Sequence, residues 1–113
     1  MKPSAGVALI AVERERQIER ERWSPEHDDD HDNGSLAKAA AVYALCAAEQ
    51  ALGWDGPFKQ PDTWPWDPEW FKPKDQLRNL VRAGALIAAE IDRVQRQIPP
   101  SSGVVTNPGR QEP

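Results

Sequence analysis

A set of apolar positions between Leu77 and Ile98 repeats at steps of three and four, and this spacing constrains the fold more than any other feature of the chain. Side chains at such steps share one face of an α-helix. The segment from Asp75, a suitable N-cap, to about Gln97 is therefore predicted to be helical and to end at the proline pair 99–100. The stripe consists of Leu77, Leu80, Val81, Gly84, Ile87, Ile91, Val94 and Ile98.

The segment from Ala5 to about Arg22 lacks proline and alternates Glu with Arg, which places opposite charges at helical spacing. It is predicted to form the first helix and to end before Pro25, because the residue preceding a proline disfavours helical backbone angles. One face of this helix is expected to pack, with Gln17 interrupting it in the second half. The apolar residues of that face are Val7, Ile10, Ala11 and Ile18.

The Ala-rich segment from Leu36 to Leu52 is predicted to form the second helix. Asn33 or Ser35 is expected to cap its start, and Gly53 is expected to close its end. Apolar residues cover most of its circumference, so we expect this helix to be the central one.

Two side chains of this second helix can carry a polar function. Tyr43 is expected to pack between helices with its hydroxyl reaching a loop. Cys46 lies among apolar residues and is expected to be an inert buried thiol. As the single cysteine of the chain, it also excludes an internal disulfide and a four-thiolate zinc site.

Residues 54–74 contain four of the five tryptophans and five of the eleven prolines of the chain. A connection of this length is usually either functional or disordered. Its aromatic side chains carry too much apolar area to be left in water, at roughly 25 cal/mol per Å². We therefore predict an ordered loop packed on the helices, with one short helical turn at 68–71.

These segments predict an all-α domain of three helices with an ordered Trp/Pro-rich loop between the second and the third. A chain of 113 residues has room for one small domain, placed at residues 1–98, and the polar residues 99–113 are expected to be a disordered tail. The apolar run 7–12 is too short to span a bilayer and lacks a following cleavage site. With a single cysteine, the expected compartment is a reducing cytosol.

The charge of the chain, −4 overall, is placed unevenly. Five carboxylates and no base lie between Glu26 and Asp32. Affinity for phosphate backbones and anionic membranes is built from clustered Lys and Arg that acids do not offset, so we expect neither a nucleic-acid partner nor a membrane partner.

This acidic stretch, Glu26–Asp32, also holds His27 and His31. Two imidazoles four residues apart among hard oxygen ligands can hold a divalent metal. The same residues can recognise a ligand directly, or can simply form a solvated loop that interacts favourably with the next helix N-terminus. All three interpretations stay open.

The segment 64–74 interleaves indoles with lysines, and two arginines follow on one face of the third helix. Indole faces stack on nucleobases, while Lys and Arg bind phosphate oxygens. The alternative is that the tryptophans only close a small core. The candidate ligand-binding residues are Trp23, Trp64, Trp66 and Trp70 for stacking, Lys72, Lys74, Arg78 and Arg82 for phosphate, and His27, Asp28, Asp29 and His31 for ribose or base edges.

Four stretches, 15–18, 23–31, 64–66 and 80–87, together resemble a family of short proteins common in phages and prophages. This resemblance spans most of residues 13–96. The part around Ile18, Trp23 and the following aspartates is also similar to the RyR domain, in which a helix carrying Arg and Ile leads to Gly-Trp and then an Asp-Asp pair. Here Arg22 stands where that glycine would be.

The resemblance implies a function. RyR-like domains in prokaryotes have been proposed to recognise nucleotide-derived ligands, and small phage anti-defence proteins include sponges that sequester cyclic-nucleotide or ADP-ribose-type immune signals. Such sponges are commonly homo-oligomers, and the third helix offers a seam for self-association.

We therefore expect a non-enzymatic protein that sequesters a nucleotide-derived small molecule, with no catalytic residues and no resident metal or cofactor. One alternative is an inhibitor that binds a host protein through the acidic stretch and exposed aromatic residues. A further alternative is a magnesium-dependent nucleotide hydrolase that uses the Asp and His residues of the acidic stretch.

Overall fold

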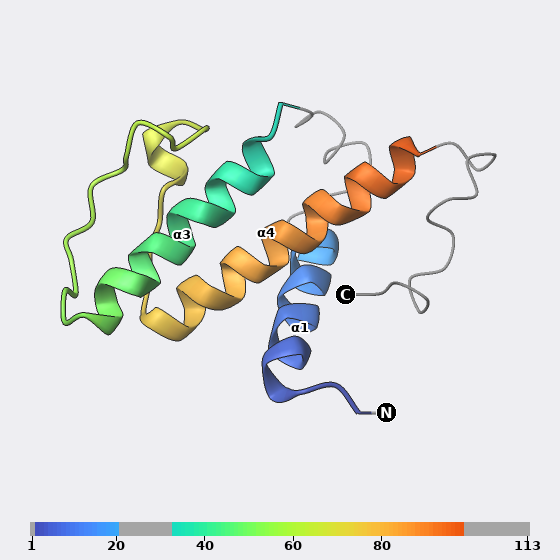
Figure 1. Ribbon diagram of the computed structural model, residues 1–113, viewed down its shortest axis with the longest axis horizontal. Coiled ribbons are helices and arrows are strands. Elements are labelled where there is room, and N and C mark those ends of the chain that lie inside the picture. The colour runs from blue at the N-terminus through green and yellow to red at the C-terminus, as the bar shows by residue number, and fades with distance from the viewer. Residues whose placement is uncertain (1, 21–32, 99–113) are drawn as a thin grey trace.

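The computed structural model describes residues 2–20 and 33–98 and confirms an all-α architecture over them. It contains three α-helices, α1 (Ala5–Arg20), α3 (Ser35–Ala51) and α4 (Gln76–Gln97), and one 3₁₀ turn, η1 (Pro68–Trp70). Figure 1 shows α3 and α4 side by side and antiparallel, with α1 crossing behind α4. The loop between α3 and α4 is ordered and contains the predicted helical turn.

The central helix is α4, so the prediction that the second helix is central was wrong. Among the described helices, α4 packs against both α3 and α1, whereas α1 and α3 do not contact each other. The physical reason lies in the alanines of α3. Three of them, Ala41, Ala44 and Ala48, face solvent. An alanine side chain exposes so little apolar area that this side of α3 needs no neighbouring helix to cover it.

The residues at the ends of α3 and α4 have the predicted roles, except at the start of α3, where the N-cap is a different residue. Asp75 caps α4, because its Oδ1 accepts a hydrogen bond of 2.8 Å from the Arg78 amide. Gly53 follows the end of α3 with φ 101°, a conformation that favours glycine. At the start of α3 the N-cap is Gly34, and Asn33 Oδ1 accepts from the Ser35 amide at 3.2 Å instead.

The core lies between α3, α4 and the loop. Tyr43 and Leu36 of α3 and Leu86 of α4 are fully buried, and the loop adds Trp64. Trp66 and Phe71 pack against this core from the loop. The core cluster consists of Leu36, Ala39, Ala40, Val42, Tyr43, Trp64, Ala83, Leu86 and Ala89.

Helix α1 packs through only part of the predicted face, since Ile10 contacts α4 but Ala11 is exposed. Val7 and Ile18 are exposed, whereas Glu13 and Gln17 are buried. Ile10 occupies the space above Gly84, where an added Cβ would lie 2.4 Å from Ile10 Cδ1. The missing side chain of Gly84 lets α1 approach α4 closely at Ile10, and the N-terminal end of α1 projects from the domain (Figure 1).

Three predictions concern residues outside the described ranges. They are the end of the first helix at residues 21–22, the acidic loop, and the tail at 99–113. Among the described helices none combines the length and the apolar character that a membrane crossing requires.

Candidate functional site

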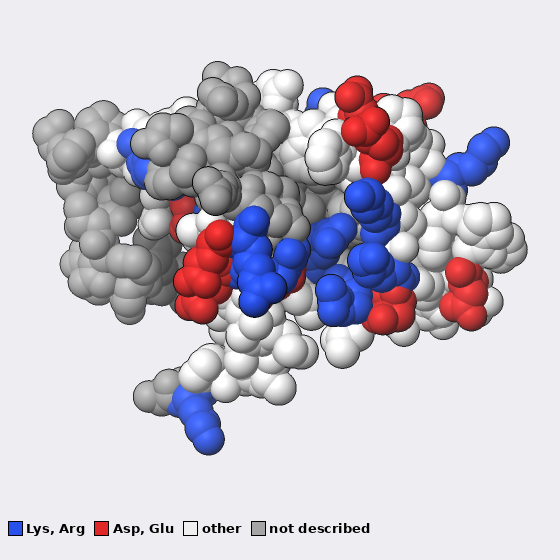
Figure 2. All heavy atoms as spheres, turned by 180° about the vertical axis from the view of Figure 1, so that it is seen from behind, with Lys and Arg blue, Asp and Glu red and all other residues white. Residues whose placement is uncertain are grey.

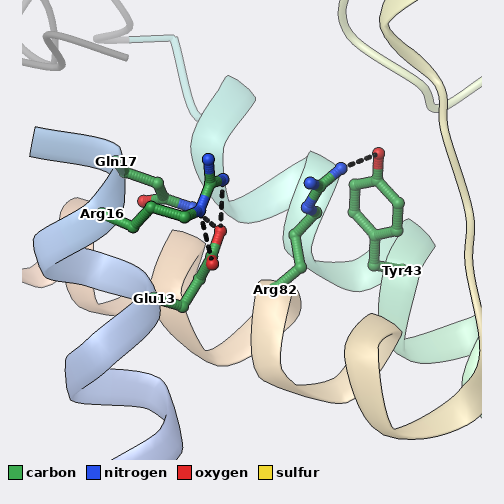
Figure 3. Close-up of polar contacts among 5 residues, drawn as sticks. All are labelled: Glu13, Arg16, Gln17, Tyr43 and Arg82. Carbon is green, nitrogen blue, oxygen red and sulfur yellow. Dashed lines mark hydrogen bonds and ion pairs between the residues drawn. The ribbon is translucent and has the colours of Figure 1, made fainter. Parts of the chain in front are cut away.

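The hydroxyl of Tyr43 joins the loop to the two core helices. It donates a hydrogen bond to the Trp70 carbonyl oxygen at 3.4 Å and accepts one from the Lys72 amide at 3.1 Å. It also accepts from Arg82 Nη1 at 3.3 Å, and the guanidinium carbon lies 5.3 Å from the ring centroid (Figure 3). A hydroxyl offers one donor and two acceptor positions, so all of its capacity is used. This confirms the prediction that Tyr43 packs between helices and reaches a loop.

Three basic side chains line one shallow pocket beside this tyrosine. Lys74 comes from the end of the loop, and Arg78 and Arg82 come from successive turns of α4. Glu13 of α1 is the carboxylate among the lining residues. Figure 2 shows Lys and Arg side chains gathered on this face of the molecule. The lining is completed by Asn79 and Val81.

Glu13 is held in place by its own helix. Arg16 donates to both carboxylate oxygens, at 2.9 Å from Nε and 2.8 Å from Nη2, and Gln17 Nε2 donates at 3.3 Å (Figure 3). The hydrogen bonds from Arg16 lower the pKa of Glu13 below its usual value. Burial opposes this shift, while the charges of Arg16 and Arg82 and the hydrogen bond from Gln17 add to it.

We predict that this carboxylate makes folding stability depend on pH. Because the pKa of Glu13 is lower in the folded state, its contribution is present above the unfolded value near 4.5 and is lost as pH falls through the folded value. The difference in unfolding free energy between the wild type and Glu13→Gln should therefore shrink between about pH 5 and pH 3. Urea unfolding at several pH values measures it. In an Arg16→Gln background most of the pH dependence of this difference should vanish, and an unchanged dependence would contradict the assignment.

Two of the predicted ligand-binding residues meet at the surface of the loop. Trp70 is 57% exposed, and Lys72 Nζ lies 5.6 Å from the centroid of its ring. The main chain of both residues is bonded to the Tyr43 hydroxyl, which in turn bonds Arg82. The Tyr43 hydroxyl thus joins the main chain of Trp70 and Lys72 to the guanidinium that lines the pocket.

Trp64 and Trp66 occupy different positions from Trp70. Trp64 is 6% exposed, and its ring packs edge-on against Tyr43 and Trp66. A ring enclosed in this way offers no face to a base, so we leave Trp64 out of the proposed site. Trp66 is partly buried against the core. The other predicted residues, Trp23, His27, Asp28, Asp29 and His31, lie outside the described ranges.

Sequence reasoning missed the two uncharged or acidic polar residues of the pocket, Glu13 and Asn79, and did not assign Val81 to it. Glu13 is one of many acids in a Glu/Arg repeat, and only its spacing of four from Gln17 signals that both share the packed face. Asn79 is 1% exposed and fixes the loop end, since its Oδ1 accepts from the Lys74 amide at 2.7 Å. An Asn four residues after an N-cap carries no signal in the sequence that distinguishes it from a surface residue.

Within residues 2–20 and 33–98, the structure gives less support to a metal site or to a reactive cysteine than to the basic pocket. No group of three or more His, Cys, Asp or Glu side chains within these ranges is placed to hold a metal ion. Burial, together with the charge of Glu49, raises the pKa of the Cys46 thiol, which disfavours the reactive thiolate. The described part of the site is thus a basic pocket and, on the loop joined to it through Tyr43, an exposed indole.

Comparisons of the chain with models of protein families, with curated proteins and with solved structures give no match. The resemblance to short phage proteins therefore stays a hypothesis. Any function has to be argued from the residues themselves.

Proposed function

We propose that the protein binds a small, nucleotide-derived anion without chemically altering it, and acts by sequestering that molecule. The observation that carries the proposal is the convergence of Lys74, Arg78 and Arg82 on one pocket that a single carboxylate shares. Guanidinium and ammonium groups placed together bind phosphate oxygens through charge-assisted hydrogen bonds. Glu13 can accept hydrogen bonds from ribose hydroxyls.

The exposed aromatic ring of Trp70 favours a nucleotide over a plain phosphate, because a base can stack on it. Trp70 presents more than half of its surface to solvent, with the Lys72 ammonium beside it. Stacking on an indole contributes about 1–3 kcal/mol per base and accepts every base type. We include Trp66 as a second, partly buried candidate for stacking, and the acidic stretch with Trp23 as candidates for the rest of the ligand. On the phage resemblance, the ligand is a cyclic-nucleotide or ADP-ribose-type signal in the host cytoplasm.

Thermal melting tests the proposal. The probes are mononucleotides, cyclic dinucleotides, ADP-ribose and inorganic phosphate, each added to the full chain. A ligand that binds only the folded state stabilises it by about 2.7 kcal/mol at one hundred times its Kd. Each kcal/mol raises the Tm of a domain of this size by roughly 4–8 °C. We expect one nucleotide class to give a shift of this order, and inorganic phosphate to give a smaller one.

Variants separate specific binding from general charge effects. Arg78→Ala and Trp70→Ala should abolish most of the shift. Lys38→Ala, which removes one positive charge from an exposed position of α3, should leave it unchanged. The proposal would be refuted if no nucleotide shifted the Tm. It would also be refuted if inorganic phosphate shifted the Tm as much as the best nucleotide does.

The second candidate is an inhibitor that binds a host protein. Trp54 and Trp70 are each more than half exposed, and exposed aromatic residues are typical anchors of protein interfaces. The same melting experiment separates the two, because this candidate predicts no stabilisation by any small molecule.

A further inference from the structure

The peptide bond between Asn33 and Gly34 lies directly before α3, and these residues form the one Asn-Gly pair of the chain. Asn33 is exposed, and Gly34 is the N-cap of α3 with φ 83° and ψ 9°. A Cβ added at Gly34 would meet no atom within 4 Å beyond its chain neighbours. The space around this peptide group is therefore open to the Asn33 side chain and to water.

The Asn33 side chain is folded toward the peptide group that follows it. Its Oδ1 accepts a hydrogen bond from the Ser35 amide at 3.2 Å. This bond closes an Asx turn, a ring of atoms that includes both Asn33 Cγ and the Gly34 nitrogen. The donated hydrogen bond also withdraws electron density from the side-chain carbonyl group. It thereby makes Cγ more electrophilic and stabilises the negative charge that develops on Oδ1 when a nucleophile attacks.

Gly34 gives the backbone nitrogen the two properties that such an attack requires. Because glycine has no Cβ, it leaves the approach to Asn33 Cγ unobstructed and tolerates the positive φ of this turn. As the N-cap, Gly34 also belongs to the residues at a helix start whose amides have no acceptor within the helix. Its amide proton can therefore be lost to solvent without breaking a helical hydrogen bond.

We propose that Asn33 is a site of spontaneous deamidation, with water as the co-reactant. The Gly34 nitrogen loses its proton to solvent and forms a bond to Asn33 Cγ. The bond from Cγ to Nδ2 then breaks, ammonia leaves, and a five-membered succinimide ring remains. Water reopens this ring, and addition at Cγ gives aspartate whereas addition at the backbone carbonyl carbon gives isoaspartate. The net change converts one amide and one water into a carboxylate and an ammonium ion, with no oxidation or reduction.

Deamidation changes the start of α3, the helix that supplies about half of the core. The first turn of α3 contains no acidic residue, and no side chain donates or accepts a capping hydrogen bond at Gly34. An aspartate at position 33 places a carboxylate next to the partial positive charge of this helix terminus. Isoaspartate instead lengthens the backbone by one carbon atom directly before the helix. The modified chains thus differ from the intact chain in charge and in how α3 begins.

Peptide mapping by mass spectrometry, after prolonged incubation of the full chain near neutral pH, tests the proposal. Trypsin cleaves after Arg22 and Lys38, and fragment 23–38 contains Asn33 and no other side-chain amide. This fragment should gain the mass difference between a carboxylic acid and an amide, and should separate into two products of equal mass. The reaction should become faster as pH rises, because the attacking nitrogen has to lose its proton.

The other two asparagines of the chain are internal controls in the same digest. Asn79 is followed by Leu80, whose amide is bonded to the preceding turn inside α4. Asn107 is followed by Pro108, which has no amide proton to lose. The fragments that contain these two asparagines should keep their mass while fragment 23–38 changes.

Two variants test the chemistry. Gly34→Ala should slow the reaction roughly tenfold, because a Cβ obstructs the approach to the side-chain carbonyl group. Alanine is strained at φ 83°, so Asn33→Gln keeps the test decisive if the start of α3 is disturbed. It retains an amide but would have to close a six-membered ring, and fragment 23–38 of this variant should keep its mass.

The proposal is overturned if Asn33 stays intact in the folded chain, including the case in which it reacts only in chains unfolded by urea. It is also overturned if Gly34→Ala or Asn33→Gln reacts as fast as the wild type. None of these outcomes bears on nucleotide binding, which the melting experiment measures separately.

Discussion

Replacing Trp64 by alanine is expected to lower the free energy of unfolding by about 3–5 kcal/mol. The indole is almost fully buried and packs edge-on against Tyr43, Trp66 and Phe71, with ring centroids 5.6, 5.4 and 5.2 Å away. Its Nε1 also donates a 3.1 Å hydrogen bond to the Asp67 carbonyl oxygen. Alanine would remove these contacts and leave a cavity where the loop meets the two core helices. Urea-induced unfolding measures the change.

Trp70→Ala is the matched control in the same loop. More than half of the Trp70 surface is exposed, and the Tyr43 hydrogen bond goes to its main-chain oxygen, which alanine retains. We therefore expect a change within about 0.5 kcal/mol. Equal losses for the two variants would show that the loop does not pack as described. A Trp64→Ala protein that keeps its stability would exclude Trp64 from the core.

The helices could be predicted from the sequence because their signals are local. Periodicity and the cap at Asp75 set the bounds of α4, and Gly53 marks the end of α3. What periodicity does not give is the direction in which a helix packs. The regular stripe of α4 predicted the helix correctly, yet the face buried against α3 is built from Ala83, Leu86 and Ala89. Tertiary contacts select that face, and they involve residues far apart in the chain.

The candidate site was harder to predict for a related reason. Trp64 and Trp70 are the same residue type, six positions apart in a segment without periodicity, and only the folded loop makes one of them core and the other surface. Lys74, Arg78 and Arg82 could be grouped from their spacing at the start of a helix. Glu13 could not be added, because it enters the pocket from α1 through the packing of Ile10 on Gly84.

Asn79→Ala is expected to cost about 2–3 kcal/mol of unfolding free energy, although the residue is polar and small. Its side chain accepts from the Lys74 amide at 2.7 Å and donates to the Lys74 carbonyl oxygen at 2.9 Å. It also donates to Gln50 Oε1 at 3.0 Å, which ties the end of α3 to the start of α4. Alanine would leave these groups without their partner in a part-buried position. Because Lys74 lines the basic pocket, the same change should also loosen the pocket.

A double-mutant cycle with Gln50 distinguishes a network from independent contacts. Gln50 Nε2 donates to the Lys74 carbonyl oxygen at 2.8 Å, so Asn79 and Gln50 hold the same peptide group as well as each other. The double variant Asn79→Ala with Gln50→Ala should therefore lose less than the sum of the single losses, by about 0.5–2 kcal/mol. Gln95→Ala, at an exposed position of the same helix, should stay within about 0.5 kcal/mol of the wild type. Strict additivity would contradict the network, because the two amides would then stabilise the loop end independently.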